Sequence, residues 1–220
     1  MLNQYQNILF PFNHFKKIDD YYLFLEPCFI NIDELFSLNK GINEKIDKNL
    51  YVEIGFGKGD FLIDFAKNNK DIPIIGIEKS QALVKEVSKK LTYNNITNVK
   101  LIEGLADFVF YFYIPYNSVK KVIINFPDPY PKKAHINRRL LNKKFFKLIY
   151  YKLTKDALIY IATDSDNYRD YVISELKSLN RFYKIERFLL GFYDQNYQTK
   201  YLRKWLKLNK KIYSLIIIKL

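Results

Sequence analysis

Between residues 50 and 126 the chain alternates short apolar runs with stretches of helical periodicity, and this alternation restricts the possible folds more than any other feature. The apolar runs span residues 50–55, 72–78, 99–103 and 119–126, and helix-like stretches separate them. Strands that are separated by helices pair in parallel through right-handed crossovers, with helices on both faces of the sheet. We therefore predict an α/β fold with a doubly wound sheet, whose ligands lie at the carboxyl ends of the strands.

The second half of the chain continues this pattern until its last two strands. Predicted helices at 142–153 and 167–179 flank a predicted strand at 157–164. Residues 182–190 and 211–219 are also predicted strands, but only one short helix, within 199–210, fits between them. Because a parallel partner needs a full crossover, we expect the last strand to insert antiparallel. This order is typical of Rossmann-like class I methyltransferases rather than of nicotinamide dehydrogenases.

The length of 220 residues allows one substantial hydrophobic core and is short for two domains. Residues 1–48 show no sustained hydrophobic period and contain Pro11, Pro27 and Gly41. We expect an irregular or partly helical N-terminal extension there. The methyltransferase domain that this strand order favours is expected at residues 49–220.

The chain carries an excess of positive charge, with 36 Lys and Arg residues against 23 Asp and Glu residues and a formal net charge of +13. The charge is clustered, because Asp128 is the only acidic residue between Lys120 and Lys155 and none follows Asp194. A basic tract of this kind attracts a polyanion through counterion release and electrostatic steering. We therefore predict a nucleic-acid partner, whereas an evenly spread charge would fit a basic protein without one.

Cysteine and histidine are too few for a disulfide framework or a zinc site. Cys28 is the only cysteine, and His14 and His135 are the only histidines. The N-terminus lacks a basic segment followed by an apolar one, and the apolar C-terminal run is far too short to span a bilayer. We expect a cytoplasmic protein without a metal site or a membrane segment, since a reducing compartment suits a single thiol.

A glycine-rich turn follows the first predicted strand in Glu53-Ile-Gly55-Phe-Gly57-Lys-Gly59. Glycines permit a tight turn and let a ligand approach the backbone. A dinucleotide fingerprint would need glycine where this chain has Asp60, and the terminal Lys and Ser/Thr of a phosphate-binding loop are absent. Glu53 favours a cationic ligand, such as a sulfonium with an α-amino group, over a pyrophosphate. The simpler alternative is a tight turn with an incidental acidic residue.

Glu78 ends the second predicted strand, 23 residues beyond Gly55. This spacing is close to that at which a carboxylate binds ribose hydroxyls in nucleoside-binding α/β folds. By itself Glu78 would fit an acidic residue that begins a helix. With the glycine turn before it, we favour the ribose-binding interpretation.

Three prolines stiffen the loop after the fourth predicted strand, Asn125-Phe-Pro-Asp-Pro-Tyr-Pro-Lys-Lys-Ala-His. This loop leaves the sheet at its carboxyl edge, where the reactive end of a cofactor is expected. A rigid loop suits methyl transfer, because alignment of the two reactants can remove roughly 7 to 11 kcal/mol of the barrier. The alternative is a proline-rich surface turn, which does not account for Asp128 inside a basic tract.

Five motifs in this order resemble bacterial tRNA (guanine-N7)-methyltransferases: EIGFGKG, GIE, NFPDPYPKKAHINRR, ATDSDNY and TKY. The resemblance covers roughly residues 50 to 213, and the Pro-Asp-Pro loop with its basic tail is its most specific part. It implies a seven-stranded sheet whose last strand is antiparallel, with S-adenosylmethionine as methyl donor. The implied acceptor is N7 of a variable-loop guanosine in tRNA.

The resemblance also implies roles for individual positions of this chain. Asp128 matches the active-site carboxylate and is our catalytic candidate. The implied cofactor-binding positions are Glu53, Gly55, Gly57, Glu78, Leu105, Ala106 and Asp128. The implied substrate-binding positions are Lys132, Asp164, Thr199, Lys200, Tyr201 and Leu202. The implied RNA-binding positions are Lys133, His135, Arg138 and Arg139.

Two positions depart from the family pattern, because Leu105 and Leu202 stand where the family usually has acidic residues. The first is an adenine contact, which backbone atoms at Leu105 and Ala106 can still make. The second is a contact to the guanine edge. Asp164, which precedes a predicted helix, has an alternative role as an N-cap.

Guanine N7 presents a lone pair and no proton, so its methylation needs no general base, metal or covalent nucleophile. We hypothesise that Asp128 and Asp164 hold the guanine by its donor edge. Two alternatives stay open at this stage. One is an amino-group methyltransferase for adenine or cytosine, since the Asn125 loop loosely resembles Asn-Pro-Pro-Tyr, and the other is a non-catalytic tRNA-binding relative. Either a monomer or a homodimer fits the sequence.

Overall fold

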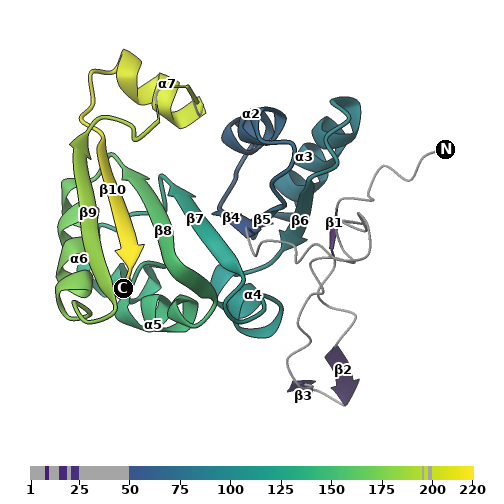
Figure 1. Ribbon diagram of the computed structural model, residues 1–220, viewed down its shortest axis with the longest axis horizontal. Helices are drawn as coiled ribbons and strands as arrows, with labels where there is room; N and C mark the ends of the chain where they lie inside the picture. Colours follow the sequence, from purple (N-terminus) through teal and green to yellow (C-terminus); the bar gives the residue numbers. More distant parts are fainter. Residues whose placement is uncertain (1–7, 10–14, 19–20, 25–49, 195, 198–199) are drawn as a thin grey trace.

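The computed structural model describes residues 8–9, 15–18, 21–24, 50–194, 196–197 and 200–220. Its main sheet has eight strands. They are β1 (Ile8–Leu9), β4 (Leu50–Ile54), β5 (Ile74–Glu78), β6 (Val99–Glu103), β7 (Val119–Asn125), β8 (Leu153–Thr163), β9 (Tyr183–Leu190) and β10 (Tyr213–Lys219). The strand order is β1-β6-β5-β4-β7-β8-β10-β9 (Figure 1).

Six of these strands run parallel, from β1 through β6, β5, β4 and β7 to β8. Strand β10 lies between β8 and β9 and is antiparallel to both. The prediction of an antiparallel last strand is confirmed. Its physical reason is the short connection, because the single helix α7 (Lys200–Lys207) between β9 and β10 cannot cross over the sheet.

The N-terminal extension differs from the sequence prediction where it is described. Ile8 and Leu9 pair in parallel with β6 and add an eighth strand to the expected seven. Strands β2 (Phe15–Ile18) and β3 (Tyr21–Phe24) form a separate antiparallel ribbon. The sequence predicts an irregular or partly helical extension instead, because strands of two to four residues are too short to produce a visible alternation of apolar and polar side chains.

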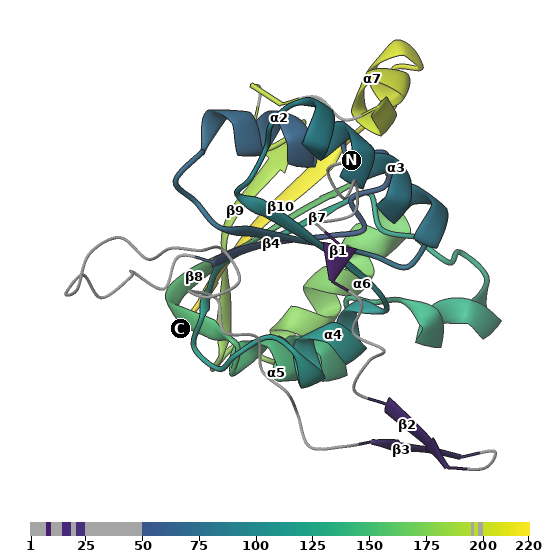
Figure 2. The ribbon, with the colours of Figure 1, turned by 90° about the vertical axis from the view of Figure 1, so that its right-hand side faces the viewer.

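Helices cover both faces of the sheet, as the doubly wound fold requires. The helices are α2 (Asp60–Asn68), α3 (Gln81–Tyr93), α4 (Ala106–Phe112), α5 (Lys143–Tyr150) and α6 (Asp166–Lys177), besides α7. Figure 2 shows α2 and α3 on one face and α4, α5 and α6 on the other. The described buried residues form two hydrophobic clusters, one with residues of α4, α5 and α6 and the other with residues of α2 and α3.

The carboxyl ends of the central parallel strands meet at one edge of the sheet. Strand β4 ends at Ile54, directly before the glycine turn, and β5 ends at Glu78. Strand β7 ends at Asn125, and β8 ends at Thr163 with Asp164 behind it. The fold therefore gathers four of the motifs found in the sequence at this edge.

Candidate active site

The glycine turn after β4 combines a left-handed backbone with open space. Gly55, Gly57 and Gly59 have φ angles of 72°, 56° and 77°, a region that side chains with a Cβ rarely enter. A Cβ on Gly55 or Gly57 would meet no atom within 4 Å, whereas one on Gly59 would lie 2.8 Å from a methyl group of Val87. Gly59 thus lets α2 pack on α3, and the first two glycines leave the turn accessible to a ligand.

Glu53, the second-to-last residue of β4, is a buried carboxylate just before this turn. Its side chain is 3% exposed, and Oε2 has no hydrogen-bond partner among the described residues. Burial raises the pKa of Glu53 to about 8, the Asn125 side chain lowers the pKa, and nearby Glu78 raises it further. A buried carboxylate oxygen without a regular hydrogen bond is costly, so this position favours a cationic or donor-bearing ligand.

Asn125 and Tyr193 complete the surroundings of Glu53. The Tyr193 hydroxyl donates to Asn125 Oδ1 at 2.8 Å, which leaves Asn125 Nδ2 buried and without an acceptor of regular geometry in the described chain. Burial and then the neighbouring Glu53 raise the pKa of Tyr193 well above its usual value. Glu53 Oε2 and Asn125 Nδ2 therefore lack a regular hydrogen bond in the described chain. A ligand with both a donor and an acceptor would satisfy them.

Glu78 joins the glycine turn to the start of α3. Its Oε2 accepts a hydrogen bond from Gly57 N at 3.2 Å, and its Oε1 accepts one from Ser80 N at 3.0 Å. Ser80 is the N-cap residue of α3. Glu78 therefore supports the helix start, as the simpler interpretation expected, and also fixes the backbone of the glycine turn.

Asp128 stands on the proline-rich loop after β7 and reaches toward the end of β5. Its Oδ2 lies 3.0 Å from Lys79 Nζ, and this hydrogen bond raises the pKa of Lys79. Lys79 directly follows Glu78 in the chain. Phe126 and Tyr130, on either side of Asp128, have φ angles of 52° and 40°, so the loop adopts a conformation that its surroundings must stabilise.

Asp164 follows β8 and does not cap α6. The N-cap residue is Ser165, whose Oγ accepts a hydrogen bond from Tyr168 N at 3.2 Å. Asp164 Oδ2 instead forms an ion pair with Lys210 Nζ at 3.1 Å. The alternative role of Asp164 as an N-cap is therefore wrong.

Comparison with known proteins identifies the family. A family model described as "Putative methyltransferase" matches residues 47–215. A tRNA (guanine-N(7)-)-methyltransferase of Chlorobium phaeobacteroides is 32% identical over 180 residues, which make up 82% of this chain and 86% of that protein. The protein of the same name in Mycoplasma genitalium is 36% identical over 206 residues, 88% of this chain and 92% of that one. The chain belongs to the tRNA (guanine-N(7)-)-methyltransferase family.

A solved structure supports the fold of this methyltransferase independently of sequence. The crystal structure of the 16S rRNA methyltransferase KamB matches with a TM-score of 0.62 at 10% identity, and the match covers 93% of this chain and 99% of that one. At such low identity the likeness concerns the fold alone. It confirms the α/β methyltransferase architecture predicted from the strand order.

The basic tract of this methyltransferase is divided between exposed and buried residues. The tract forms the short 3₁₀ helix η2 (Lys133–Arg138), in which Arg138 is exposed and His135 half-buried, and Lys132 before it is exposed. Arg139, by contrast, is 2% exposed. A phosphate cannot reach a side chain so deep in the protein, so the prediction that Arg139 binds RNA is corrected. The side chain of Lys133 lies outside the described part.

The two departures from the family pattern differ in their surroundings. Leu105 is 61% exposed at the N-cap of α4, and Ala106 behind it is buried. Leu202, on α7, is 4% exposed. A glutamate at the Leu202 position would have to be buried, so an apolar residue suits this packing. Thr199 lies outside the described residues, as do the side chains of Lys200 and Tyr201.

Helix α7 is held over the site edge by contacts from both sides. Arg203 forms an ion pair with Asp60 of α2 at 2.9 Å, next to the glycine turn. Lys210, just after the helix, pairs with Asp164 and lies 3.7 Å from the ring centre of Trp205. The segment predicted to bind substrate therefore bridges the two sides of the sheet edge.

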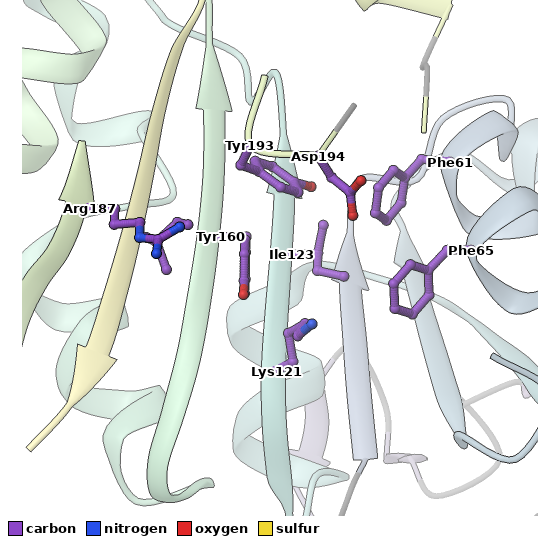
Figure 3. A pocket seen from close by; sticks show the side chains of 9 residues that line it. Phe61, Phe65, Lys121, Ile123, Tyr160, Arg187, Tyr193 and Asp194 are labelled. Atoms are coloured by element: carbon purple, nitrogen blue, oxygen red, sulfur yellow. The ribbon is translucent and has the colours of Figure 1, made fainter. Parts of the chain in front are cut away.

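A cavity of about 180 Å³ lies beside this site, on the sheet face that carries α2 (Figure 3). Its walls combine the aromatic residues Phe61, Phe65, Tyr160 and Tyr193 with the charged residues Lys121, Arg187 and Asp194. The Lys121 ammonium is 4.8 Å from the Tyr160 ring centre, and burial lowers its pKa. None of the site residues predicted from the sequence lines this cavity.

Sequence reasoning missed four residues that the structure brings to the site, which are Lys79, Asn125, Tyr193 and Lys210. It named Arg139 but did not predict its burial. Among the four missed residues, Asn125 had a signal in the sequence, because it ends a strand at the carboxyl edge.

In the described part of the chain, no helix is long and apolar enough to cross a membrane. The same residues contain no group of three His, Cys, Asp or Glu side chains that could hold a metal ion, and His14 and Cys28 lie outside them.

Proposed function

We propose that this chain transfers a methyl group from S-adenosylmethionine to N7 of a variable-loop guanosine in tRNA. The observation that carries the proposal is the meeting of Glu53, Glu78, Asp128 and Asp164 at one sheet edge, in a member of the tRNA (guanine-N(7)-)-methyltransferase family. A protein that modifies tRNA needs access to tRNA, so we also propose the cytoplasm as its location.

The glycine turn and its neighbours fit the amino-acid and ribose parts of the cofactor. Glu53 Oε2 and Asn125 Nδ2 lack partners in the described chain, and an α-amino acid group offers an ammonium to the first and a carboxylate to the second. Glu78 has lone pairs left beside its two backbone contacts, with which it can accept hydrogen bonds from ribose hydroxyls. Gly55 and Gly57 leave room for the approach of the ligand.

The chemistry at the base needs alignment rather than proton removal. When bound, S-adenosylmethionine supplies a methyl group on a positively charged sulfur atom. Guanine N7 already carries a free lone pair, so the residues have to orient the base and favour the positive charge that it gains. We assign this task to Asp128 and Asp164. Each carboxylate now pairs with a lysine, Lys79 or Lys210, and both stand at the edge where the base would enter.

The RNA is held by positive charge next to this edge. Lys132 and Arg138 are exposed on the tract that follows the Asp128 loop. The net charge of +13 would draw tRNA toward the protein, and phosphate contacts would then fix its register. Sequence-specific readout is not needed from these two side chains.

Nucleoside analysis of bulk tRNA, after incubation with the protein and S-adenosylmethionine, tests the proposal. We expect N7-methylguanosine and no other new nucleoside. N6-methyladenosine would indicate an amino-group methyltransferase instead. No modified nucleoside, together with retained tRNA binding, would indicate a non-catalytic relative. Glu78→Ala serves as the control, because it should lower the yield at limiting cofactor.

A further inference from the structure

Arg139 is one of the largest side chains that are buried in the described protein. Its Nε donates a hydrogen bond to the carbonyl of Pro129 at 2.9 Å, and its Nη2 donates to the carbonyl of Tyr130 at 3.3 Å. Nη2 also donates to Oδ1 of Asn167. The guanidinium lies 4.7 Å from the ring centre of Tyr171 and 5.4 Å from that of Tyr168. Carbonyls, an amide and aromatic rings thus surround this cation.

Burial of this cation costs free energy, so its contacts are best explained by the segments that they hold in place. In the described part of the chain, Arg139 forms no ion pair with a carboxylate, and its hydrogen-bond acceptors are all neutral oxygens. A buried cation without an ionic partner is weak evidence for a gain in stability. A planar fork of donors, however, fixes the direction of each acceptor that it binds, which a lysine ammonium cannot do.

The acceptors of Arg139 belong to the two segments that present the candidate carboxylates. Pro129 and Tyr130 directly follow Asp128, and Tyr130 has a φ angle of 40° that its contacts must stabilise. Asn167 lies in the first turn of α6, three residues after Asp164. One guanidinium therefore ties the loop after β7 to the helix start after β8.

We propose that Arg139 is a positioning residue that sets the separation of Asp128 and Asp164. Arg138 beside it is exposed and keeps the RNA-binding role, so the two neighbouring arginines have different tasks. This inference rests on the proposed function, because Asp128 and Asp164 matter together only if they face one base. It assigns Arg139 no contact with substrate, cofactor or RNA.

The test compares Arg139→Lys, which keeps the charge and loses the fork, with Arg138→Ala. For Arg139→Lys we expect single-turnover methylation at saturating tRNA and cofactor to fall by about tenfold to a hundredfold, because misplacement of catalytic groups by about 1 Å has this effect. Cofactor affinity, tRNA affinity and the salt dependence of tRNA binding should match those of the wild type.

Arg138→Ala should lower tRNA affinity and reduce the slope of log affinity against log salt by about 0.7 to 0.9. Arg181→Lys, an exposed arginine before β9, is the matched control for the substitution itself.

A second variant keeps the test decisive if Arg139→Lys does not fold. Asn167→Ala removes only the link to α6 and should slow single turnover by roughly threefold to tenfold, as expected for the loss of one hydrogen bond. Hydrogen exchange of a peptide spanning residues 125–139 should quicken in both variants. A full rate in folded Arg139→Lys or in Asn167→Ala would overturn the proposal, as would a loss of tRNA affinity in Arg139→Lys equal to that in Arg138→Ala.

The outcome is separable from that of the proposed function. If the wild type forms no N7-methylguanosine, the proposed function fails whatever the loop does. If the wild type is active but hydrogen exchange of residues 125–139 is unchanged in Arg139→Lys and Asn167→Ala, only the positioning role of Arg139 is refuted.

Discussion

At the residue scale, the position of Glu53 favours the binding of a ligand and lowers the stability of the ligand-free protein. Its carboxylate is buried at the end of β4 with Oε2 unpaired among the described residues, and burial raises its pKa to about 8. Ionisation at this position therefore opposes folding. A ligand ammonium that pairs with Glu53 would offset this cost, and the ion pair would favour binding of the ligand.

Glu53→Gln should stabilise the free protein at high pH. The folded pKa of about 8 lies above the ordinary value of 4.5. A carboxyl with a raised folded pKa contributes its full stability below the unfolded pKa, and this stability is lost as the pH rises through the folded pKa. We expect the free energy of unfolding of the variant to exceed that of the wild type by on the order of a few kcal/mol at pH 9 and to equal it near pH 4. Chemical denaturation at both pH values measures this difference.

The same variant should bind S-adenosylmethionine more weakly, since a neutral amide cannot form an ion pair with an ammonium. Calorimetry at pH 8 measures the affinity. A stability gain that is the same at pH 4 and pH 9 would assign the effect to packing and would remove titration of Glu53 from the explanation.

Glu78→Ala should weaken cofactor binding by one to two decades. Charge-assisted hydrogen bonds to ribose hydroxyls contribute about 1.5 to 3 kcal/mol, and each decade of affinity corresponds to roughly 1.4 kcal/mol. The variant also removes the acceptor for Gly57 N, so the glycine turn loses a contact. Calorimetric titration provides the measurement, and an unchanged affinity would exclude Glu78 from the cofactor site.

Asp164→Asn should separate catalysis from stability. Asp164 pairs with Lys210 near the surface, and such pairs contribute only about 0 to 1 kcal/mol. We expect nearly unchanged melting and cofactor affinity, but single-turnover methylation lower by two decades or more, about 2.7 kcal/mol in the transition state.

The neighbouring Ser165→Ala is the matched control for Asp164→Asn. Ser165 caps α6, so its loss should cost about 1 kcal/mol of stability while the rate per folded molecule stays the same. Equal single-turnover rates for the wild type and Asp164→Asn, with bound RNA in excess, would refute a role for Asp164 at the base.

At the element scale, the loop after β7, η2 and the start of α6 act as one unit around Arg139. The hydrogen bonds of the guanidinium join the loop to α6, while Arg138 at the end of η2 stays exposed. Arg138 is the last residue of η2, whereas Arg139 follows it with an extended backbone, so the helical turn ends between the two arginines. This geometry allows Arg138 and Arg139 to serve different purposes.

Replacing Lys132 and Arg138 together by Ala should weaken tRNA binding and reduce its salt dependence. If each side chain contacts one phosphate, the slope of log affinity against log salt should fall by about 0.7 to 0.9 per lost contact. Filter binding over a series of salt concentrations measures the slope. A slope like that of the wild type would mean that this face is merely solvated.

At the scale of the whole molecule, much of the architecture follows from the order of patterns along the chain. Alternating apolar runs and helical stretches predicted the parallel sheet, because local periodicity decides which segments become strands or helices. The short connection at 199–210 predicted the antiparallel β10, since chain length limits the possible crossovers. Strand ends predicted the edge at which Glu53, Glu78 and Asp164 stand. The extent of the methyltransferase domain at residues 49–220 stays a prediction.

The sequence by itself thus determined seven strands of the sheet, the edge at which the candidate residues stand and the residue types placed there, because these depend on local periodicity and connection length. Only the tertiary structure decided which charges face inward. Arg139 is buried because carbonyls of one segment and an amide of another converge on it, and Asn125 and Tyr193, 68 residues apart, meet above Glu53. Such long-range partners depend on packing between elements, and no spacing along the chain encodes them.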